Sequence, residues 1–182
     1  PYADAAVAWI AERLPLRRVL DLAAGTGKLT RQLVALGVDV VAVEPGNAMR
    51  AVLERAVPGV EALAGSAESI PLPAGVVDVV TVGQAFHWFR SDEAVAEMHR
   101  VLRPGGGFAL LWNTWDEQDP LLRAMSAVTD PLRPLEAGRD RSWRERYDRT
   151  LFGPLEERTF RQTRTMTTDA LVAWAASTSA LL

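Results

Sequence analysis

Short apolar runs alternate with amphipathic segments over the first two thirds of the chain. Helical spacing of apolar residues predicts helices at 2–13, at about 26–36, at 47–56 and at 91–102. Runs rich in Val, Leu and Ala predict buried strands at 18–23, 38–43, 60–64, 76–83 and 108–112. Strands and helices that alternate at this spacing form a parallel sheet with helices on both faces. The expected fold class is therefore a doubly wound α/β sheet.

The pattern changes after residue 113. Residues 156–167 have the composition of an irregular extended segment, and helices are predicted at 119–128, 139–150 and 168–182. The chain begins at Pro1 and ends inside an apolar helical pattern, so we expect it to be part of a longer protein.

Composition narrows the classes of protein that the chain can represent. Its 182 residues are 48% hydrophobic and 24% charged, and the formal net charge of −3 gives no electrostatic reason to expect a nucleic-acid partner. The absence of cysteine excludes disulfides and thiolate metal sites, and no metal site is expected. The uncharged stretch 170–182 is too short to span a bilayer, and no signal peptide is visible. We expect no membrane partner and a cytoplasmic location.

The segment from Val19 to Thr30 carries the strongest functional pattern. An apolar run ends at Asp21, small residues follow, and a helix-forming segment begins near Thr26. A strand, a tight turn and a helix N-terminus in this order hold nucleotide-like ligands in α/β folds. Two other nucleotide motifs are excluded. The dinucleotide pattern G-x-G-x-x-G requires glycines where the chain has Ala23 and Lys28, and the Walker A pattern requires Gly and then Ser or Thr where it has Leu22 and Leu29.

A second acidic residue, Glu44, ends the second predicted strand. It follows Gly25 by 19 residues, and in a sheet of this kind that spacing places a carboxylate beside a ribose, where it accepts hydrogen bonds from both hydroxyls. The alternative is a solvated acid that caps the helix after Pro45. Taken together with Asp21 and the two glycines of the first turn, the ribose interpretation is preferred.

These residues resemble motif I of the Rossmann-like S-adenosylmethionine-dependent methyltransferases. That motif is usually written D-x-G-x-G-x-G, and Ala23 stands here in place of the first glycine. Further similarity lies in Glu-Pro-Gly-Asn-Ala-Met at 44–49, in the loop at 65–72, and in Arg-Val-Leu-Arg-Pro-Gly-Gly at 100–106. The segment Gln-Ala-Phe-His-Trp-Phe at 84–89 is similar to the type-11 small-molecule methyltransferases.

The resemblance covers about residues 16–116 and implies a single methyltransferase domain over 1–182. In that domain, 16–116 would be the cofactor-binding core and 117–182 a helical insertion and C-terminal part. The mostly parallel family sheet ends in an antiparallel hairpin, of which only a first strand near 157–166 is visible in the sequence. We therefore expect this hairpin to be incomplete.

The implied cofactor is S-adenosylmethionine, and the implied reaction is methyl transfer to a small molecule that offers a carboxylate, hydroxyl or amine. A cofactor-binding regulatory or assembly protein without catalysis is the alternative, and the sequence leaves the oligomeric state undetermined. The residues expected to contact the cofactor are Asp21, Ala23, Gly25, Thr26, Gly27, Glu44, Pro45, Met49, Ala67, Glu68 and Gln84.

Aromatic residues after the fourth and fifth strands predict the acceptor pocket. The expected members are Phe86, His87, Trp88, Trp112 and Asn113, although core packing is the preferred alternative for Phe86. Three roles stay open for His87: a general base, a neutral hydrogen-bond donor to substrate, or a structural residue of the loop. The segment 100–106 is expected to end a helix and start a strand, without chemistry of its own, whereas Tyr2 is a further candidate to fold over the cofactor.

Overall fold

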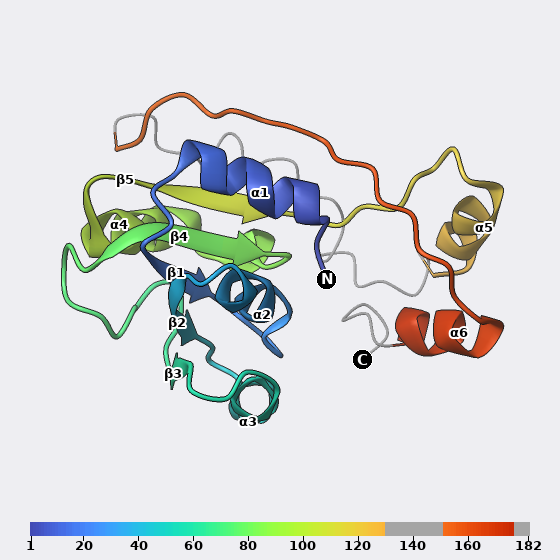
Figure 1. Ribbon diagram of the computed structural model, residues 1–182, viewed down its shortest axis with the longest axis horizontal. Coiled ribbons are helices and arrows are strands. Elements are labelled where there is room, and N and C mark those ends of the chain that lie inside the picture. Colours follow the sequence, from blue (N-terminus) through green and yellow to red (C-terminus); the bar gives the residue numbers. More distant parts are fainter. Residues whose placement is uncertain (130–150, 177–182) are drawn as a thin grey trace. The chain divides into compact units, whose positions relative to one another are not determined.

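The computed structural model describes residues 1–129 and 151–176 of the chain (Figure 1). Among these residues, one compact unit contains 1–112 and 151–160, and a second contains 113–129 and 161–176. The sheet expected from the sequence lies in the first unit. The expectation of a single domain over the whole chain stays a prediction.

Five parallel strands form the sheet of the first unit. They are β1 (Arg18–Leu22), β2 (Asp39–Val43), β3 (Glu61–Leu63), β4 (Val77–Gly83) and β5 (Leu102–Leu111), in the order β3-β2-β1-β4-β5. In the register, Asp21 of β1 lies opposite Ala42 of β2 and Thr81 of β4. The expected doubly wound, mostly parallel sheet is therefore confirmed.

Helices cover both faces of this sheet (Figure 1). The helices of the first unit are α1 (Asp4–Arg13), α2 (Lys28–Ala35), α3 (Asn47–Ala56) and α4 (Ser91–Val101). Side chains of α1 and α2 share one core with Val19, whereas side chains of α4 share the other core with Leu20 and Leu22. Both faces of the strand are thus buried, which explains why β1 is a continuous apolar run with one acid.

The fifth strand begins earlier than the sequence predicts. Residues 103–107, expected as a turn before a strand at 108–112, belong to β5, and the register against β4 shifts between Val77 and Val79. Glycine allows this irregular pairing, because a Cβ on Gly106 would lie 2.6 Å from the carbonyl oxygen of Asp78. The helix predicted at 91–102 is α4, whose first residue is Ser91 and whose N-cap is Arg90.

The region beyond the sheet differs from the sequence prediction in one respect. Residues 154–166 contain no strand, so the predicted first strand of an antiparallel hairpin near 157–166 is wrong. The predicted helix at 139–150 lies outside the described residues. In the first unit, Phe152 packs edge-on against Phe108 of β5, with ring centroids 4.7 Å apart, and this contact ties the segment 151–160 to the sheet.

The second unit contains α5 (Pro120–Thr129) and α6 (Thr168–Ala176), near two of the predicted helices. Asp119 accepts the N–H groups of Leu121 and Leu122 at 2.9 and 3.2 Å and so caps the start of α5. Across the described parts of the chain, no helix combines the length and apolar character that a membrane crossing requires.

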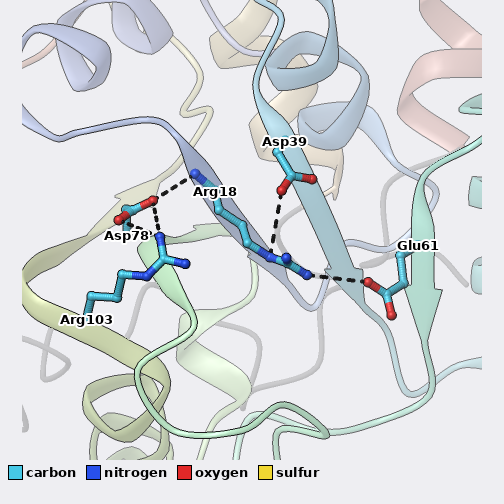
Figure 2. Close-up of polar contacts among 5 residues, drawn as sticks. All are labelled: Arg18, Asp39, Glu61, Asp78 and Arg103. Atoms are coloured by element: carbon cyan, nitrogen blue, oxygen red, sulfur yellow. Dashed lines mark hydrogen bonds and ion pairs between the residues drawn. The ribbon is translucent and has the colours of Figure 1, made fainter.

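Charged side chains tie the amino ends of the five strands together (Figure 2). Asp78 accepts the N–H of Arg18 at 2.9 Å and two hydrogen bonds from Arg103 at 2.9 Å. The Arg18 guanidinium in turn reaches Asp39 at 3.8 Å and Glu61 at 3.7 Å. Hydrogen bonds from Arg18 and Arg103 outweigh the opposing effect of burial and hold the pKa of Asp78 below its ordinary value. This network lies at the opposite edge of the sheet from the predicted site.

Candidate functional site

The strand order of the sheet reverses where the predicted site residues are. Connections run in one direction from β1 to β2 and β3 and in the other from β4 to β5, so the order reverses between β1 and β4. Ligands of open α/β sheets bind at such a reversal, beyond the carboxyl ends of the strands. The turn after Leu22 and the segment after Gly83 both begin at this edge.

The turn after β1 has three residues with left-handed backbone conformations. Ala23, Gly25 and Gly27 have φ angles of +55°, +57° and +78°. A Cβ on Gly27 would lie 3.0 Å from Cγ of Leu53 in α3, so the start of α2 approaches α3 too closely for a side chain there. A Cβ on Gly25 would meet nothing within 4 Å, which leaves the backbone of this half-buried turn, including Thr26, open to a ligand.

Asp21 lies beneath this turn and is almost completely buried, with 1% of its surface exposed. Thr30, in the first turn of α2, donates a hydrogen bond to Oδ2 at 2.6 Å, and Thr81, its register partner on β4, donates to Oδ1 at 3.3 Å. Burial raises the pKa of Asp21 to about 6, and the charge of Glu44 adds to the rise, although the threonine hydrogen bonds oppose it. The site therefore holds a carboxyl group that titrates close to physiological pH.

Glu44 joins the end of β2 to the turn after β1. Its Oε2 accepts the N–H of Gly25 at 2.9 Å, and its Oε1 accepts the N–H of Gly46, just before α3, at 2.8 Å. The residue is 3% exposed, so the interpretation as a solvated acid is wrong. Two backbone hydrogen bonds fix the carboxylate, and each of its oxygens keeps a lone pair for a ligand hydroxyl.

The side chain of Met49 lies over the same backbone. A Cβ on Gly46 would come 3.2 Å from Cε of Met49 and 2.9 Å from Oε1 of Glu44, which shows how closely the three residues pack. Met49 itself is 47% exposed, and the neighbouring Pro45 is exposed. Both predicted residues therefore lie at the surface beside Glu44.

The loop after β3, residues 65–72, begins beside Glu44, whose N–H donates to the carbonyl of Leu63 at 3.0 Å. Ala67 is buried in the core, with 4% of its surface exposed. The carboxylate of Glu68 accepts the N–H of Arg90 at 2.9 Å, so it connects this loop to the segment that follows β4. Burial opposes ionisation of Glu68, but the hydrogen bonds it accepts, that of Arg90 first, hold its pKa below the ordinary value.

The segment after β4 forms a short 3-10 helix, η1 (Phe86–Trp88). Gln84 enters it with a φ of +60° and donates its N–H to Leu111 of β5 at 2.9 Å. Phe86 is 3% exposed and packs in the core, as the preferred alternative for this residue predicted. His87 is half-buried, with its ring 4.9 Å from that of Trp88, and Trp88 is 56% exposed.

The predicted residues after β5 divide between the two units. Trp112 belongs to the first unit and packs partly buried against the core that contains the α4 side chains. Asn113 belongs to the second unit and accepts a hydrogen bond from Gln162 at 3.2 Å. That these two residues line an acceptor pocket stays a prediction.

Tyr2 lies at the same edge as Asp21 and β4. The side-chain amide of Gln32 accepts the N–H of Tyr2 at 2.8 Å and donates to its carbonyl at 2.9 Å. The phenol reaches the end of β4, because a Cβ on Gly83 would overlap the Tyr2 hydroxyl. Burial, and after it the charge of Asp21, raises the pKa of Tyr2 far above its ordinary value.

Sequence reasoning missed Thr30, Thr81 and Gln32 at this edge. Thr81 had a visible signal, since it is the one hydroxyl residue in the apolar run of β4 and sits near the carboxyl end of a buried strand. A buried hydroxyl in such a place needs a hydrogen-bond partner, and Asp21 is the acceptor at the matching position of β1. Thr30 and Gln32 have no comparable signal, because both fit an ordinary amphipathic helix.

The fold is a mostly parallel, Rossmann-like sheet flanked by helices. Residues 20–110 match the family described as methyltransferase domain, type 11, and the chain belongs to this family. It is 49% identical over 138 residues to an uncharacterized methyltransferase of Mycobacterium tuberculosis, a match that covers 72% of the chain and 56% of that protein. It is 37% identical over 156 residues to an uncharacterized methyltransferase-like protein of Schizosaccharomyces pombe, covering 84% of the chain and 60% of that protein.

A solved structure from Anaeromyxobacter dehalogenans, assigned as a type II methyltransferase, has the same fold. It aligns with a TM-score of 0.74 and 29% identity over 98% of this chain and 78% of that one. The chain thus spans little more than half the length of the curated relatives named above.

Proposed function

We propose that the chain binds S-adenosylmethionine at the carboxyl edge of β1, β2 and β3 and transfers its methyl group to a small-molecule acceptor. The observation that carries the proposal is the position of Glu44, which is buried and held by the amides of Gly25 and Gly46 at 2.9 and 2.8 Å. A fixed carboxylate with free lone pairs, beside an open glycine turn, suits the two hydroxyls of a ribose.

The turn after β1 suits the amino-acid end of the same ligand. A Cβ on Gly25 would meet nothing within 4 Å, and the N-terminus of α2 favours a carboxylate through the helix dipole. Asp21 lies beneath, where an ionised carboxylate attracts an ammonium group across the turn or through water. The dinucleotide pattern is absent at the same turn, which disfavours a nicotinamide cofactor.

S-adenosylmethionine supplies, when bound, a sulfonium-linked methyl group that is already a strong electrophile. The chain's own contribution is to hold the acceptor in position and to exclude water. Trp88 offers an exposed aromatic face after β4 for this purpose. His87, half-buried beside it, can accept a proton from a hydroxyl or amine acceptor, whereas a carboxylate acceptor needs no base.

Calorimetric titration tests the cofactor. S-adenosylmethionine, S-adenosylhomocysteine and NAD are titrated into the wild type, Glu44→Ala and a control, Glu54→Ala, which alters an exposed glutamate of α3. We expect both sulfur ligands to bind the wild type and the control equally and to bind Glu44→Ala about 10- to 100-fold more weakly, because hydrogen bonds to a charged group are worth about 1.5–3 kcal/mol. Melting curves of all three proteins confirm folding.

Failure of the wild type to bind either sulfur ligand, or binding of NAD in their place, would contradict the proposal. The transfer step is tested by incubation with isotopically methyl-labelled S-adenosylmethionine and acceptors of the carboxylate, hydroxyl and amine classes. If S-adenosylmethionine binds but no acceptor class is methylated, the proposed cofactor site stands and the proposed methyl transfer is refuted.

A further inference from the structure

An ion pair on α4 makes contacts that the proposed function does not use. Glu97 and Arg100 lie three residues apart on the helix, and the guanidinium donates to both carboxylate oxygens, from Nε to Oε1 at 2.5 Å and from Nη2 to Oε2 at 2.7 Å. Their side chains are 21% and 35% exposed, so water screens the pair only in part. The pair is therefore partly shielded from water, unlike a fully exposed surface ion pair.

Both members of the pair also bind the backbone of the loop 65–72. The N–H of Ile70 donates to Oε2 of Glu97 at 2.9 Å. Arg100 donates from Nη1 to the carbonyl of Leu72 at 2.7 Å and from Nη2 to the carbonyl of Ile70 at 2.9 Å. Three polar groups of the loop backbone, two on Ile70 and one on Leu72, are thus paired with one bidentate ion pair, which fixes both position and orientation.

The place of this loop in the sheet order indicates what it faces. The turn after β1, Glu44 after β2 and the loop after β3 follow one another along the same edge, because β1, β2 and β3 are neighbours. If Glu44 holds a ribose and the turn after β1 holds the amino-acid end, the base attached to that ribose lies at the third position. The loop backbone near Ala67 and Glu68 is then the surface that reads the base edge.

We propose that Glu97 and Arg100 are positioning residues that hold the loop 65–72 in the conformation that selects adenine over other bases. The proposal rests on the proposed function, because it assigns a selectivity to that cofactor site. Neither side chain touches the ligand. They act through Ile70 and Leu72, whose backbone groups they hold. In this way they determine the orientation of the backbone amides and carbonyls at Ala67 and Glu68, earlier in the same loop.

Arg103 provides a matched control from the same sequence segment. It also pairs with a carboxylate, that of Asp78, by donating from Nη1 to both oxygens at 2.9 Å, and its side chain is 44% exposed. This pair, drawn in Figure 2, lies near the amino ends of β4 and β5, whereas the proposed site lies beyond the carboxyl ends of the strands. An Arg→Lys change there removes the same chemistry and leaves the loop 65–72 untouched.

The experiment measures binding of S-adenosylhomocysteine and S-inosylhomocysteine, which differ only in an amino or an oxo group on the base. Calorimetry gives the ratio of the two dissociation constants for the wild type, Arg100→Lys and Arg103→Lys. We expect the wild type to prefer adenine and Arg100→Lys to lower this preference by about three- to tenfold, the value of one hydrogen bond. Arg103→Lys should keep the wild-type ratio even if it melts at a lower temperature.

The outcomes separate the two proposals. A wild type that binds neither ligand overturns the proposed function and this inference with it. A wild type that prefers adenine, with the same ratio in Arg100→Lys, overturns only the inference, and so does an equal fall of the ratio in Arg103→Lys. If Arg100→Lys does not fold, Glu97→Gln replaces it, since it weakens the ion pair and the Ile70 contact while it keeps the size of the side chain.

Discussion

The buried carboxyl group of Asp21 predicts that a substitution at the site stabilises the protein. Its pKa rises from 3.8, its ordinary value, to about 6 in the fold, chiefly because of burial. Each pKa unit corresponds to about 1.4 kcal/mol, so the charge of Asp21 costs the folded state about 3 kcal/mol at neutral pH. Asp21→Asn removes that charge and keeps a similar shape, and we expect it to raise the free energy of unfolding at pH 7 by up to about 3 kcal/mol.

The sign of the pH dependence follows from the raised pKa. Between pH 4 and 6 the folded state of the wild type holds more protons at Asp21 than the unfolded state does, so this contribution to stability falls as pH rises through that window. The advantage of Asp21→Asn should therefore be small near pH 4, grow up to about pH 6 and stay constant above pH 7. Urea denaturation followed by circular dichroism, at intervals from pH 4 to 8, measures the difference between the two proteins.

Asp78→Asn serves as a control with the opposite sign. The lowered pKa of Asp78 means that its charge stabilises the fold above its ordinary pKa, and that this contribution is lost as pH falls through the folded pKa. We expect Asp78→Asn to destabilise the protein by about 1–3 kcal/mol at pH 7, less at pH 4. An Asp21→Asn difference that does not change between pH 4 and 7, or that has the sign of Asp78→Asn, would refute the reasoning.

Three further substitutions test the geometry of the same edge by urea denaturation. Ala23→Gly should stabilise the protein by about 1 kcal/mol, because Ala23 has a φ of +55°, whereas the control Ala24→Gly should destabilise it. Gly27→Ala should cost about 1–3 kcal/mol, since its φ is +78° and the new Cβ would lie 3.0 Å from a side chain of α3. Gly83→Ala should cost a similar amount because it displaces the Tyr2 phenol, and in a Tyr2→Ala background most of that cost should disappear.

Local patterns in the sequence were sufficient for most of the sheet. Each predicted strand up to Gly83 overlaps an observed one, because apolar runs that end at Gly, Pro or an acid have few other solutions in an alternating α/β chain. The prediction failed at residues 103–107, where glycines that usually mark a turn instead pair with β4 as part of β5. It failed again near 157–166, where β-branched and charged residues form no strand.

Only those site residues that have a recognisable local sequence pattern could be predicted. Asp21 and Glu44 stand out as acids at the ends of apolar strands, and both lie buried at the expected edge. The hydrogen-bond donors to these two carboxylates have no such pattern, because Thr30 and the amide of Gly25 reach them only when the strands are aligned. The contacts of Arg100 with the loop 65–72 span about 30 residues and depend on how α4 packs, which no local pattern encodes.

The two edges of the sheet follow opposite physical rules. At the amino edge, Asp78 is paired with Arg18 and Arg103, and its charge stabilises the fold. At the carboxyl edge, Ala23 and Gln84 adopt left-handed conformations that glycine would adopt more easily, and Asp21 carries a charge in a buried place. Strained backbone conformations and buried charges persist where the surrounding structure enforces them, and they concentrate at functional sites. A ligand with an ammonium group would compensate the charge of Asp21. Binding of such a ligand should therefore strengthen as pH rises through about 6. The edge of the sheet that destabilises the free protein is thus the edge best prepared to hold a ligand.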